Sequence, residues 1–425
     1  MDQEASRDLI SESSKTIMPG YSLGNQALDI VLLTDSFLPH AGGSRVYYFN
    51  LYKRLAEQYG DRVTVLTNKM PGWRDFDCHI CTDSFRIIRQ YRPLPNWKYR
   101  QYPKMVRSIA RAFHHIYTHP ADLLHTGDIL PQGLAGMWTK KALGLPYIAY
   151  CHGEDITQID SRRYQPAIRD AIYRNADAVI AANEFARRNL VRIGVEDSAI
   201  YKLTPGVDSE RFSPRQPRQD LVRQFGLQGK TVLLSVGRLV ARKGHGVVLR
   251  ALAQLQDRVP PFHYLIAGEG SEEACLHSLV REFGLLNRVT FLGKVPDTEL
   301  ADFYALSDLF VLVNREVDGD LEGFGMVFLE ANAAGKAVLG GRTGGTAEAV
   351  IDNSTGLLVD PENIEETRKA LELLLLNADL RNHFGERGRC RAVSEFSWED
   401  RAHLLHEICA DVLNRHRTLQ SQRSS

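Results

Sequence analysis

The 425-residue sequence predicts an α/β protein built of two doubly wound domains in tandem. The chain is too long for one ordinary hydrophobic core. Short apolar runs alternate with helical stretches along most of its length, which is typical of parallel sheets covered by helices on both faces. A proline-punctuated segment at residues 204–217 divides this alternation into two series. We therefore expect an active cleft between two similar halves.

The first domain is expected at residues 28–206. Residues 1–27 are polar, lack the apolar core of a signal peptide and are interpreted as a flexible extension. The buried runs that predict parallel strands lie at 28–34, 62–67, 85–89, 122–125, 147–150, 178–182 and 199–203. A helical pattern at residues 44–58 follows the first of these strands.

The second domain is expected at residues 207–396. Its predicted strands lie at 231–237, 263–267, 288–292, 308–313 and 337–340, again with helical stretches between them. The remaining residues, 397–425, are expected to form a helix with a loose tail.

Two loops of the first domain carry candidate site residues, because ligands of such sheets gather beyond the carboxyl ends of the strands. Gly42 and Gly43 lie between the first strand and its helix, where backbone amides can approach an anion. A third glycine at dinucleotide spacing is missing, so NAD is disfavoured, and a tight turn is the alternative explanation of the pair. His152 follows another strand, although a lone histidine is more often structural.

The matching loop of the second domain carries two cations. Arg238 and Lys243 lie between glycines after the strand at 231–237, where their charges can converge on a diphosphate. A solvated loop is the alternative. We favour phosphate contact because the loop stands at the carboxyl end of a buried strand.

Two carboxylates stand eight residues apart in the stretch Glu322-Gly-Phe-Gly-Met-Val-Phe-Leu-Glu330. The glycines predict that Glu322 precedes a helix that begins near Gly325, and that Glu330 lies inside it. Free amides and the positive end of the helix dipole then lie between the two carboxylates, a setting that suits phosphate. A nucleotide-sugar, with hydroxyls at both ends and phosphates between, fits this arrangement. Two glutamates on a solvated surface are the alternative.

Cysteine content and hydropathy argue against a disulfide-rich secreted protein and against a membrane-spanning one. Six cysteines spread over the chain make no disulfide framework, which favours a reducing, cytoplasmic setting. Cys78 and Cys81 have the spacing of half a zinc site, but no second pair follows, so two unrelated thiols are favoured. No apolar run reaches the roughly eighteen residues of a membrane span. We expect no metal and no cofactor.

One stretch of the first domain is strongly basic. Residues 84–121 contain no Asp or Glu, and aromatic residues are interleaved with the cations. The basic residues are Arg86, Arg89, Arg92, Lys98, Arg100, Lys104, Arg107 and Arg111. Such a surface suits an anionic lipid headgroup or membrane interface, so we expect peripheral attachment to the inner face of the membrane through Arg86 to Arg111. Core packing with solvated charges is the alternative, and nucleic acid is not expected.

With these residues assembled, the chain resembles the retaining glycosyltransferases of family 4, which have the two-domain GT-B fold of Rossmann-like halves. The likeness covers residues 30 to about 398. The motifs that carry it, in order, are Ala41-Gly-Gly43, His152-Gly-Glu, Pro205-Gly-Val-Asp208 with Phe212 and Pro214, Gly237-Arg-Leu with Lys243-Gly, Ala267-Gly-Glu-Gly270, Glu322-Gly-Phe-Gly with Glu330, and Gly344-Gly-Thr-Ala-Glu348. Each motif alone is weak, and the ordered set is specific.

The resemblance implies roles for these residues. Gly42 and Gly43 would approach the donor phosphates, and Arg238 with Lys243 would neutralise the diphosphate leaving group. Residues implied to contact the donor are Lys294 and Val295 at the base, Phe324, Gly325 and Met326 at the helix start, and Glu330 at the ribose. Glu322 would hold the transferred sugar and His152 would line its pocket. The helix after Trp398 would return to the acceptor-side first domain.

The implied reaction is hexosyl transfer with retention from a nucleotide-diphosphate sugar to a lipid or glycan acceptor, without bound metal. The local sequence around Glu322 is similar to that of family members that mannosylate phosphatidylinositol-type lipids. This similarity favours GDP-mannose over a UDP-sugar as the donor. A nucleotide-sugar 2-epimerase is the alternative enzyme, and a non-catalytic sugar-nucleotide-binding protein is the alternative of another class. An epimerase would change the configuration of the donor sugar without an acceptor, and a binding protein would not turn the donor over at all.

Overall fold

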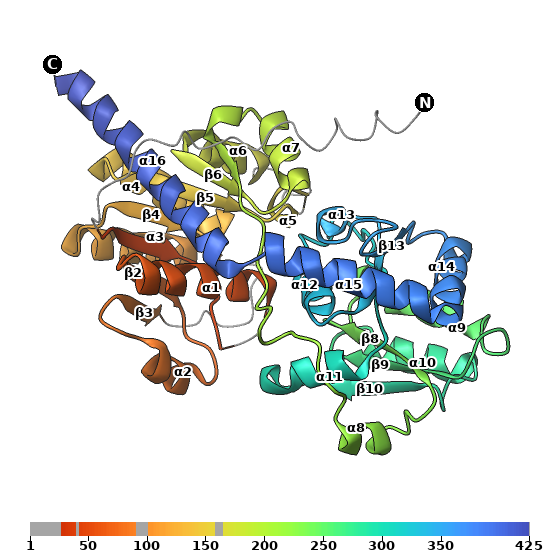
Figure 1. Ribbon diagram of the computed structural model, residues 1–425. Helices are drawn as coiled ribbons and strands as arrows, with labels where there is room; N and C mark the ends of the chain where they lie inside the picture. The colour runs from red at the N-terminus through yellow and green to blue at the C-terminus, as the bar shows by residue number, and fades with distance from the viewer. Residues whose placement is uncertain (1–26, 40–41, 91–100, 158–164, 425) are drawn as a thin grey trace, which may run out of the picture.

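The computed structural model describes residues 27–39, 42–90, 101–157 and 165–424, which form two α/β halves (Figure 1). Residues 1–26 of the expected extension lie outside the described part. Each half contains one parallel sheet with helices on both of its faces.

The N-terminal sheet has seven parallel strands in the order β3-β2-β1-β4-β5-β6-β7. Their bounds are β1 (Asp29–Leu33), β2 (Arg62–Asn68), β3 (Phe85–Gln90), β4 (Leu123–Thr126), β5 (Tyr147–Cys151), β6 (Ala178–Ala181) and β7 (Ile200–Lys202). The central strands β4, β5 and β6 are buried at every residue, which is why they appear as continuous apolar runs in the sequence.

Helices cover both faces of this sheet. Their bounds are α1 (Gly43–Gln58), α2 (Trp73–Ile80), α3 (Gln101–Thr118), η1 (Ile129–Gly133), α4 (Leu134–Leu143), α5 (Glu154–Thr157), α6 (Gln165–Asn175), α7 (Glu184–Arg192) and η2 (Asp197–Ala199). One core cluster joins the sheet to α1, and another joins its opposite face to α3, α4 and α6.

The C-terminal sheet has six parallel strands in the order β10-β9-β8-β11-β12-β13. The strands are β8 (Thr231–Val236), β9 (Phe262–Ala267), β10 (Val289–Gly293), β11 (Leu309–Leu312), β12 (Ala337–Gly341) and β13 (Gly356–Val359). The helices of this half are α8 (Gln219–Gln224), η3 (Ala241–Lys243), α9 (His245–Ala253), α10 (Glu273–Glu282), η4 (Asp297–Glu299), α11 (Leu300–Leu306), α12 (Met326–Ala333), α13 (Thr346–Ala349), α14 (Ile364–Leu376) and α15 (Ala378–Glu395). The last helix of the chain is α16 (Trp398–Ser424).

The chain crosses from the N-terminal half to the C-terminal half near Val207 and returns near Phe396, and the two crossings lie side by side. The backbone N–H of Val207 donates to the carbonyl of Phe396 at 2.8 Å, so the outgoing and returning segments are bonded to each other. Beyond this point α16 packs along α1 of the N-terminal half (Figure 1). Its buried residues Trp398, Leu405 and Ile408 belong to the same core cluster as β1. The last helix therefore completes the N-terminal half.

Two details differ from the sequence-based expectation. The strand β13 lies at the edge of the second sheet, and its four-residue run is too short to be recognised by periodicity alone. The C-terminal tail was expected to be loose, but it is helical as far as Ser424, the last residue of α16. Residues 414–424 contain neither glycine nor proline, so nothing in them ends the helix earlier.

Candidate active site

His152 stands directly after β5, at the carboxyl edge of the N-terminal sheet. Its backbone N–H donates to the Asp155 carboxylate at 2.8 Å, and its ring Nε2 lies 2.6 Å from the hydroxyl of Tyr48 on α1. The backbone carbonyl of His152 accepts from the Asn183 side chain at 3.3 Å. Both the backbone and the ring of His152 are thus fixed by neighbours.

The glycine loop of the N-terminal half approaches the donor-side helix of the other half. A Cβ added at Gly43, the first residue of α1, would lie 3.9 Å from Cε of Met326, the first residue of α12. Gly42 immediately precedes α1. The structure therefore brings the predicted residues Gly43 and Met326 together from opposite halves.

Glu322 is the anion of a buried charge cluster. Its carboxylate accepts from Nη1 of Arg242 at 2.8 Å and from Nζ of Lys243, and all three residues are only 8% exposed. Burial alone would raise the pKa of Glu322, but the charges of Lys243 and Arg242 hold it below its ordinary value. Glu322 is therefore a carboxylate with a fixed orientation.

Of the two cations predicted from the sequence, only Lys243 contacts Glu322. Arg238 is exposed in the loop between β8 and η3, where its guanidinium remains accessible to a ligand. The loop also contains Arg242, whose Nε lies 3.2 Å from the carboxylate of Asp320. Two cations of this loop, Arg242 and Lys243, thus contact the segment before α12.

Glu330 lies one helix turn inside α12 and is partly buried. Its carboxylate accepts from the hydroxyl of Tyr304 on α11 at 2.7 Å. Burial raises the pKa of Glu330 to about 7, against the opposing effects of the Tyr304 hydrogen bond and the Arg211 charge. The two glutamates of the motif therefore differ in electrostatic setting, because Glu322 has cationic partners and Glu330 a neutral one.

Gly325 immediately precedes α12 and has a left-handed conformation, with φ of 82°. Phe324 beside it is buried, with its ring centroid 6.0 Å from that of Phe396. Lys294 and Val295 follow β10, where Lys294 is exposed and Val295 packs against the core. All the donor-side residues predicted from the sequence therefore lie in loops or helix starts after strands, apart from Glu330.

Gly344 and Gly345, the pair before α13, pack against the backbone of the Glu322 loop. The N–H of Gly345 donates to the Glu322 carbonyl at 3.1 Å. A Cβ added at Gly344 would collide with that carbonyl, and one added at Gly345 would collide with the carbonyl of Gly323. Both glycines therefore lie in close contact with the backbone of the Glu322 loop.

Contacts across the halves converge near this loop. The side-chain amide of Asn183, the residue that caps α7, donates to the carbonyl of Gly323. Glu348 of α13 accepts from the N–H of Glu184 at 2.5 Å and lies 3.5 Å from Nζ of Lys202. His152 and the Glu322 loop are therefore held next to each other by groups from both halves.

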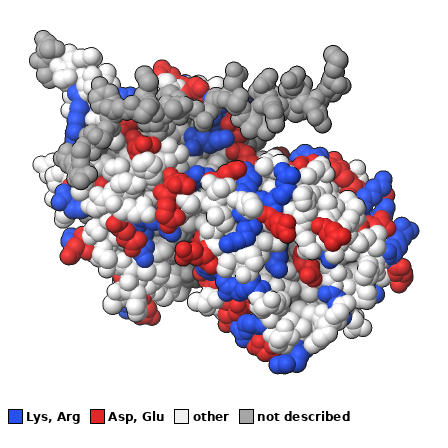
Figure 2. Space-filling view, in the orientation of Figure 1, with Lys and Arg blue, Asp and Glu red and all other residues white. Residues whose placement is uncertain are grey.

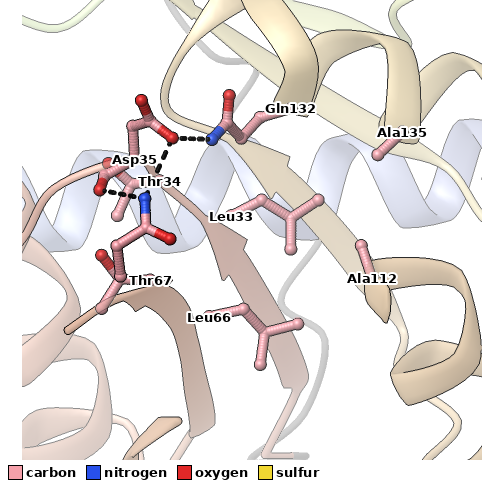
Figure 3. Close-up of a pocket in the computed structure, with 9 residues that line it drawn as sticks. Leu33, Thr34, Asp35, Leu66, Thr67, Ala112, Gln132 and Ala135 are labelled. Atoms are coloured by element: carbon pink, nitrogen blue, oxygen red, sulfur yellow. Dashed lines mark hydrogen bonds between the residues drawn. The ribbon is translucent and has the colours of Figure 1, made fainter. Parts of the chain in front are cut away.

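A pocket opens beyond β1 and β2 at the edge of the sheet that also carries His152 (Figure 3). Asp35 accepts from the side-chain amides of Gln132 at 3.0 Å and Asn68 at 3.2 Å. The other lining residues are Leu33, Thr34, Leu66, Thr67, Ala112 and Ala135. No cation lines it among the described residues, so its chemistry suits neutral hydroxyl groups better than phosphate.

The basic stretch is described only in part. Arg86 and Arg111 are exposed, whereas the side chain of Arg89 is buried, 1% exposed, and forms an ion pair with Asp77 at 2.7 Å. Arg89 is therefore a structural residue and not a surface cation, which corrects the expectation for it. The remaining cations of the stretch lie outside the residues and side chains that the structure describes.

Surface charge elsewhere is mixed. On the face in Figure 2, cations and anions are interspersed over the C-terminal half. Cys78 and Cys81 are exposed free thiols, and the described ranges hold no group of three or more His, Cys, Asp or Glu side chains placed to bind a metal. Among the described helices, none is long and apolar enough to cross a membrane.

Sequence reasoning missed several residues that contact the predicted ones, among them Tyr48, Arg242 and Tyr304. Arg242 adjoins Lys243 in the loop already singled out, so its charge was a usable signal. Tyr48 and Tyr304 are distant in sequence from His152 and Glu330, and no local pattern indicates these contacts.

Comparison with known proteins agrees with this geometry. Residues 41–211 match the family described as Glycosyltransferase Family 4, and residues 217–391 match Glycosyl transferases group 1. The chain is 30% identical over 404 residues to the D-inositol 3-phosphate glycosyltransferase of Corynebacterium jeikeium, covering 88% of this chain and 92% of that protein.

A second relative is the GDP-mannose-dependent alpha-(1-6)-phosphatidylinositol monomannoside mannosyltransferase of Mycolicibacterium smegmatis. It is 28% identical over 385 residues, which cover 89% of this chain and 97% of the relative. Among solved structures, sucrose-phosphate synthase from Thermosynechococcus elongatus has a TM-score of 0.76 at 24% identity, with 91% of this chain and 99% of that one covered.

HepE of Anabaena, in complex with UDP and glucose, has a TM-score of 0.74 at 19% identity, over 89% of this chain and 98% of that one. These two structures show the shared fold. The paired sheets, the ordered motifs and the family matches lead to one conclusion: this chain is a glycosyltransferase that belongs to family 4 and has the GT-B fold.

Proposed function

We propose that this glycosyltransferase moves a mannosyl group from GDP-mannose, with retention of configuration, to a hydroxyl of a lipid-linked polyol or glycan. The observation that carries the proposal is the buried cluster of Glu322, Arg242 and Lys243 at the start of α12, with Glu330 one helix turn further on. The C. jeikeium relative is named for an inositol phosphate substrate, and the M. smegmatis relative for GDP-mannose and a phosphatidylinositol mannoside.

The donor would lie along α12. Its ribose hydroxyls would bond to Glu330, its diphosphate would lie between Arg238, Lys243 and the amides at the start of α12, and its sugar would reach Glu322. Lys243 contacts Glu322 in the structure, so an incoming diphosphate would compete for this ammonium group. Arg242 would keep Glu322 charged during that exchange.

The chemistry follows from where charge develops. Breaking the glycosyl–phosphate bond places negative charge on the departing diphosphate and positive charge on the sugar ring. Cations held against the diphosphate stabilise that transition state more than the bound donor. The expected absence of a bound metal is part of the proposal, because Arg238 and Lys243 would provide this charge; EDTA would then leave the transfer rate unchanged.

The acceptor would enter from the N-terminal half. The pocket beyond β1 and β2 presents amide and carboxylate groups that suit hydroxyls. Exposed Arg86 and Arg111 suit an anionic bilayer, and attachment to the inner face of the membrane is proposed on this basis. Flotation with anionic and with neutral liposomes tests it: equal binding to both would contradict this attachment.

The donor assignment is tested by thermal shift with a panel of nucleotide diphosphates and their sugars, because a ligand of the folded state raises its stability. GDP and GDP-mannose should raise the melting temperature, and UDP, ADP and their sugars should do so less. Stabilisation by UDP-sugars alone would overturn the GDP assignment. Recovery of a donor epimer without acceptor would overturn the transfer reaction.

A further inference from the structure

The hydroxyl of Tyr48 makes two short hydrogen bonds at a buried position. Its oxygen lies 2.6 Å from the carbonyl oxygen of Gly127 and 2.6 Å from Nε2 of His152. Tyr48 is 1% exposed on α1, five residues after Gly43. The helix that begins at the glycine loop therefore also contacts the histidine of the candidate sugar pocket.

Proton counting fixes the direction of both bonds. A carbonyl oxygen only accepts, so Gly127 must receive the single hydroxyl proton of Tyr48. Burial, together with nearby Asp128, keeps the pKa of Tyr48 well above its ordinary value, so this proton is retained. The contact with His152 is then satisfied only if Nε2 carries a hydrogen and donates it to the Tyr48 oxygen.

We propose that Tyr48 is a positioning residue that holds His152 in the tautomer with hydrogen on Nε2, leaving the ring lone pair on Nδ1. The assignment of a tautomer follows from the partner of one nitrogen, as it does for other buried histidines. Nothing in the local sequence around His152 indicates this partner.

The surrounding rings restrict His152 to one orientation. The ring of Tyr47 is perpendicular to it at 5.7 Å between centroids, and the ring of Tyr150 is nearly parallel at 6.4 Å. The hydroxyl of Tyr47 donates to a different acceptor, the carbonyl of Leu203, at 2.8 Å. Tyr47 therefore shares the packing of Tyr48 without its bond to His152, which makes it a matched control.

The consequence for catalysis rests on the proposed function. In the fixed tautomer Nδ1 carries no hydrogen, so any contact that the sugar or the acceptor made with this nitrogen would have His152 as the hydrogen-bond acceptor. In the other tautomer Nδ1 would carry a hydrogen and repel the same donor. Tyr48 would thus set whether His152 accepts or donates at the reaction site.

The test is ¹⁵N NMR of the full chain with labelled histidine, without any donor or acceptor. The His152 signals are assigned from a His152→Asn sample, and the tautomer is determined from the shifts of the two ring nitrogens. We expect a protonated Nε2 in the parent protein. A parent spectrum with hydrogen on Nδ1 would overturn the proposal, even if no Tyr48 variant folds.

Variants then identify the cause. Tyr48→Phe should mix the two tautomers and lower kcat by about tenfold, with a smaller change in the donor KM. Tyr47→Phe, which also loses one buried hydroxyl, should leave the His152 spectrum unchanged. An unchanged His152 spectrum in folded Tyr48→Phe would contradict the role of Tyr48.

This spectrum is independent of the assigned reaction. If the parent shows the expected tautomer but transfers no sugar, the proposed function fails and the structural role of Tyr48 remains. If the parent transfers mannose while His152 has hydrogen on Nδ1, the positioning role fails alone.

Discussion

Glu322 has two buried cationic partners, Arg242 and Lys243, that were not expected from the sequence to contact it. Lys243 was predicted as a phosphate ligand, and in the structure its ammonium group donates to Glu322. Arg242 is bound to Glu322 and lies beside Asp320, so it is less available to a ligand than exposed Arg238. Of the two arginines of this loop, Arg242 therefore holds Glu322, and Arg238 is the one proposed to bind the diphosphate.

Removing Arg242 should affect the charge balance around Glu322 more than the cations proposed to bind the diphosphate. Arg242→Met leaves Glu322 with Lys243 alone, so donor binding should weaken by roughly tenfold and stability should fall by about 1–3 kcal/mol. Calorimetric titration with donor and thermal unfolding measure these effects. Arg250→Met, on the exposed face of α9, is the control, and equal behaviour of the two variants would contradict the assignment.

Glu330 gives a pH prediction. Its pKa is about 7 in the folded protein, above the ordinary 4.5, so the folded state binds the extra proton between these values. Its effect on stability therefore becomes more unfavourable as pH rises through this window. Glu330→Gln should gain stability relative to the parent between about pH 5 and pH 8, by up to roughly 3 kcal/mol.

Chemical denaturation at several pH values measures this gain, with Glu282→Gln at the exposed end of α10 as the control. The same Glu330→Gln variant should bind GDP more weakly, because an amide replaces the proposed ribose ligand. A stability difference that stays constant across the pH range would show that Glu330 is not the titrating group.

At the level of elements, the loop before α12 depends on the turn before α13. Gly345 has an ordinary backbone conformation, with φ of −85°, so its requirement for glycine comes only from contact with the Gly323 carbonyl. This contact links two loops that follow neighbouring strands, β11 and β12. The position of Glu322 is thus set by backbone packing as well as by charge.

Gly345→Ala should displace this loop. We expect a loss of about 1–3 kcal/mol in stability and weaker donor binding, since the added methyl group has no space. Gly246→Ala, inside α9 and with only ordinary contacts, should leave stability equal or higher. Unchanged donor affinity in Gly345→Ala would mean that the loop tolerates displacement.

Elements were predictable to different extents. The buried strands and α12 could be located because apolar runs and glycine breaks are local signals. The bond from Asn183 to Gly323 and the ring contact of Tyr48 could not, since each joins residues of separate elements that meet only after folding. Arg89 shows the converse, because a residue in a basic stretch became part of the interior through Asp77.

At the scale of the whole molecule, the tandem rhythm of strands and helices was sufficient to predict two doubly wound halves. The relative placement of the halves was not predictable from periodicity, because it depends on the crossing near Val207 and on contacts such as Glu348 with Glu184. These contacts place His152 and Glu322 on facing loops, which is the arrangement that transfer between a donor and an acceptor requires.

The central claim is that Glu322 in this arrangement supports transfer from GDP-mannose. The direct measurement is the rate of mannose transfer to a phosphatidylinositol-type acceptor by the parent, Glu322→Gln and the exposed control Glu316→Gln. We predict transfer by the parent and the control, and a loss of at least about 100-fold in Glu322→Gln. Equal rates in the parent and Glu322→Gln would contradict the account.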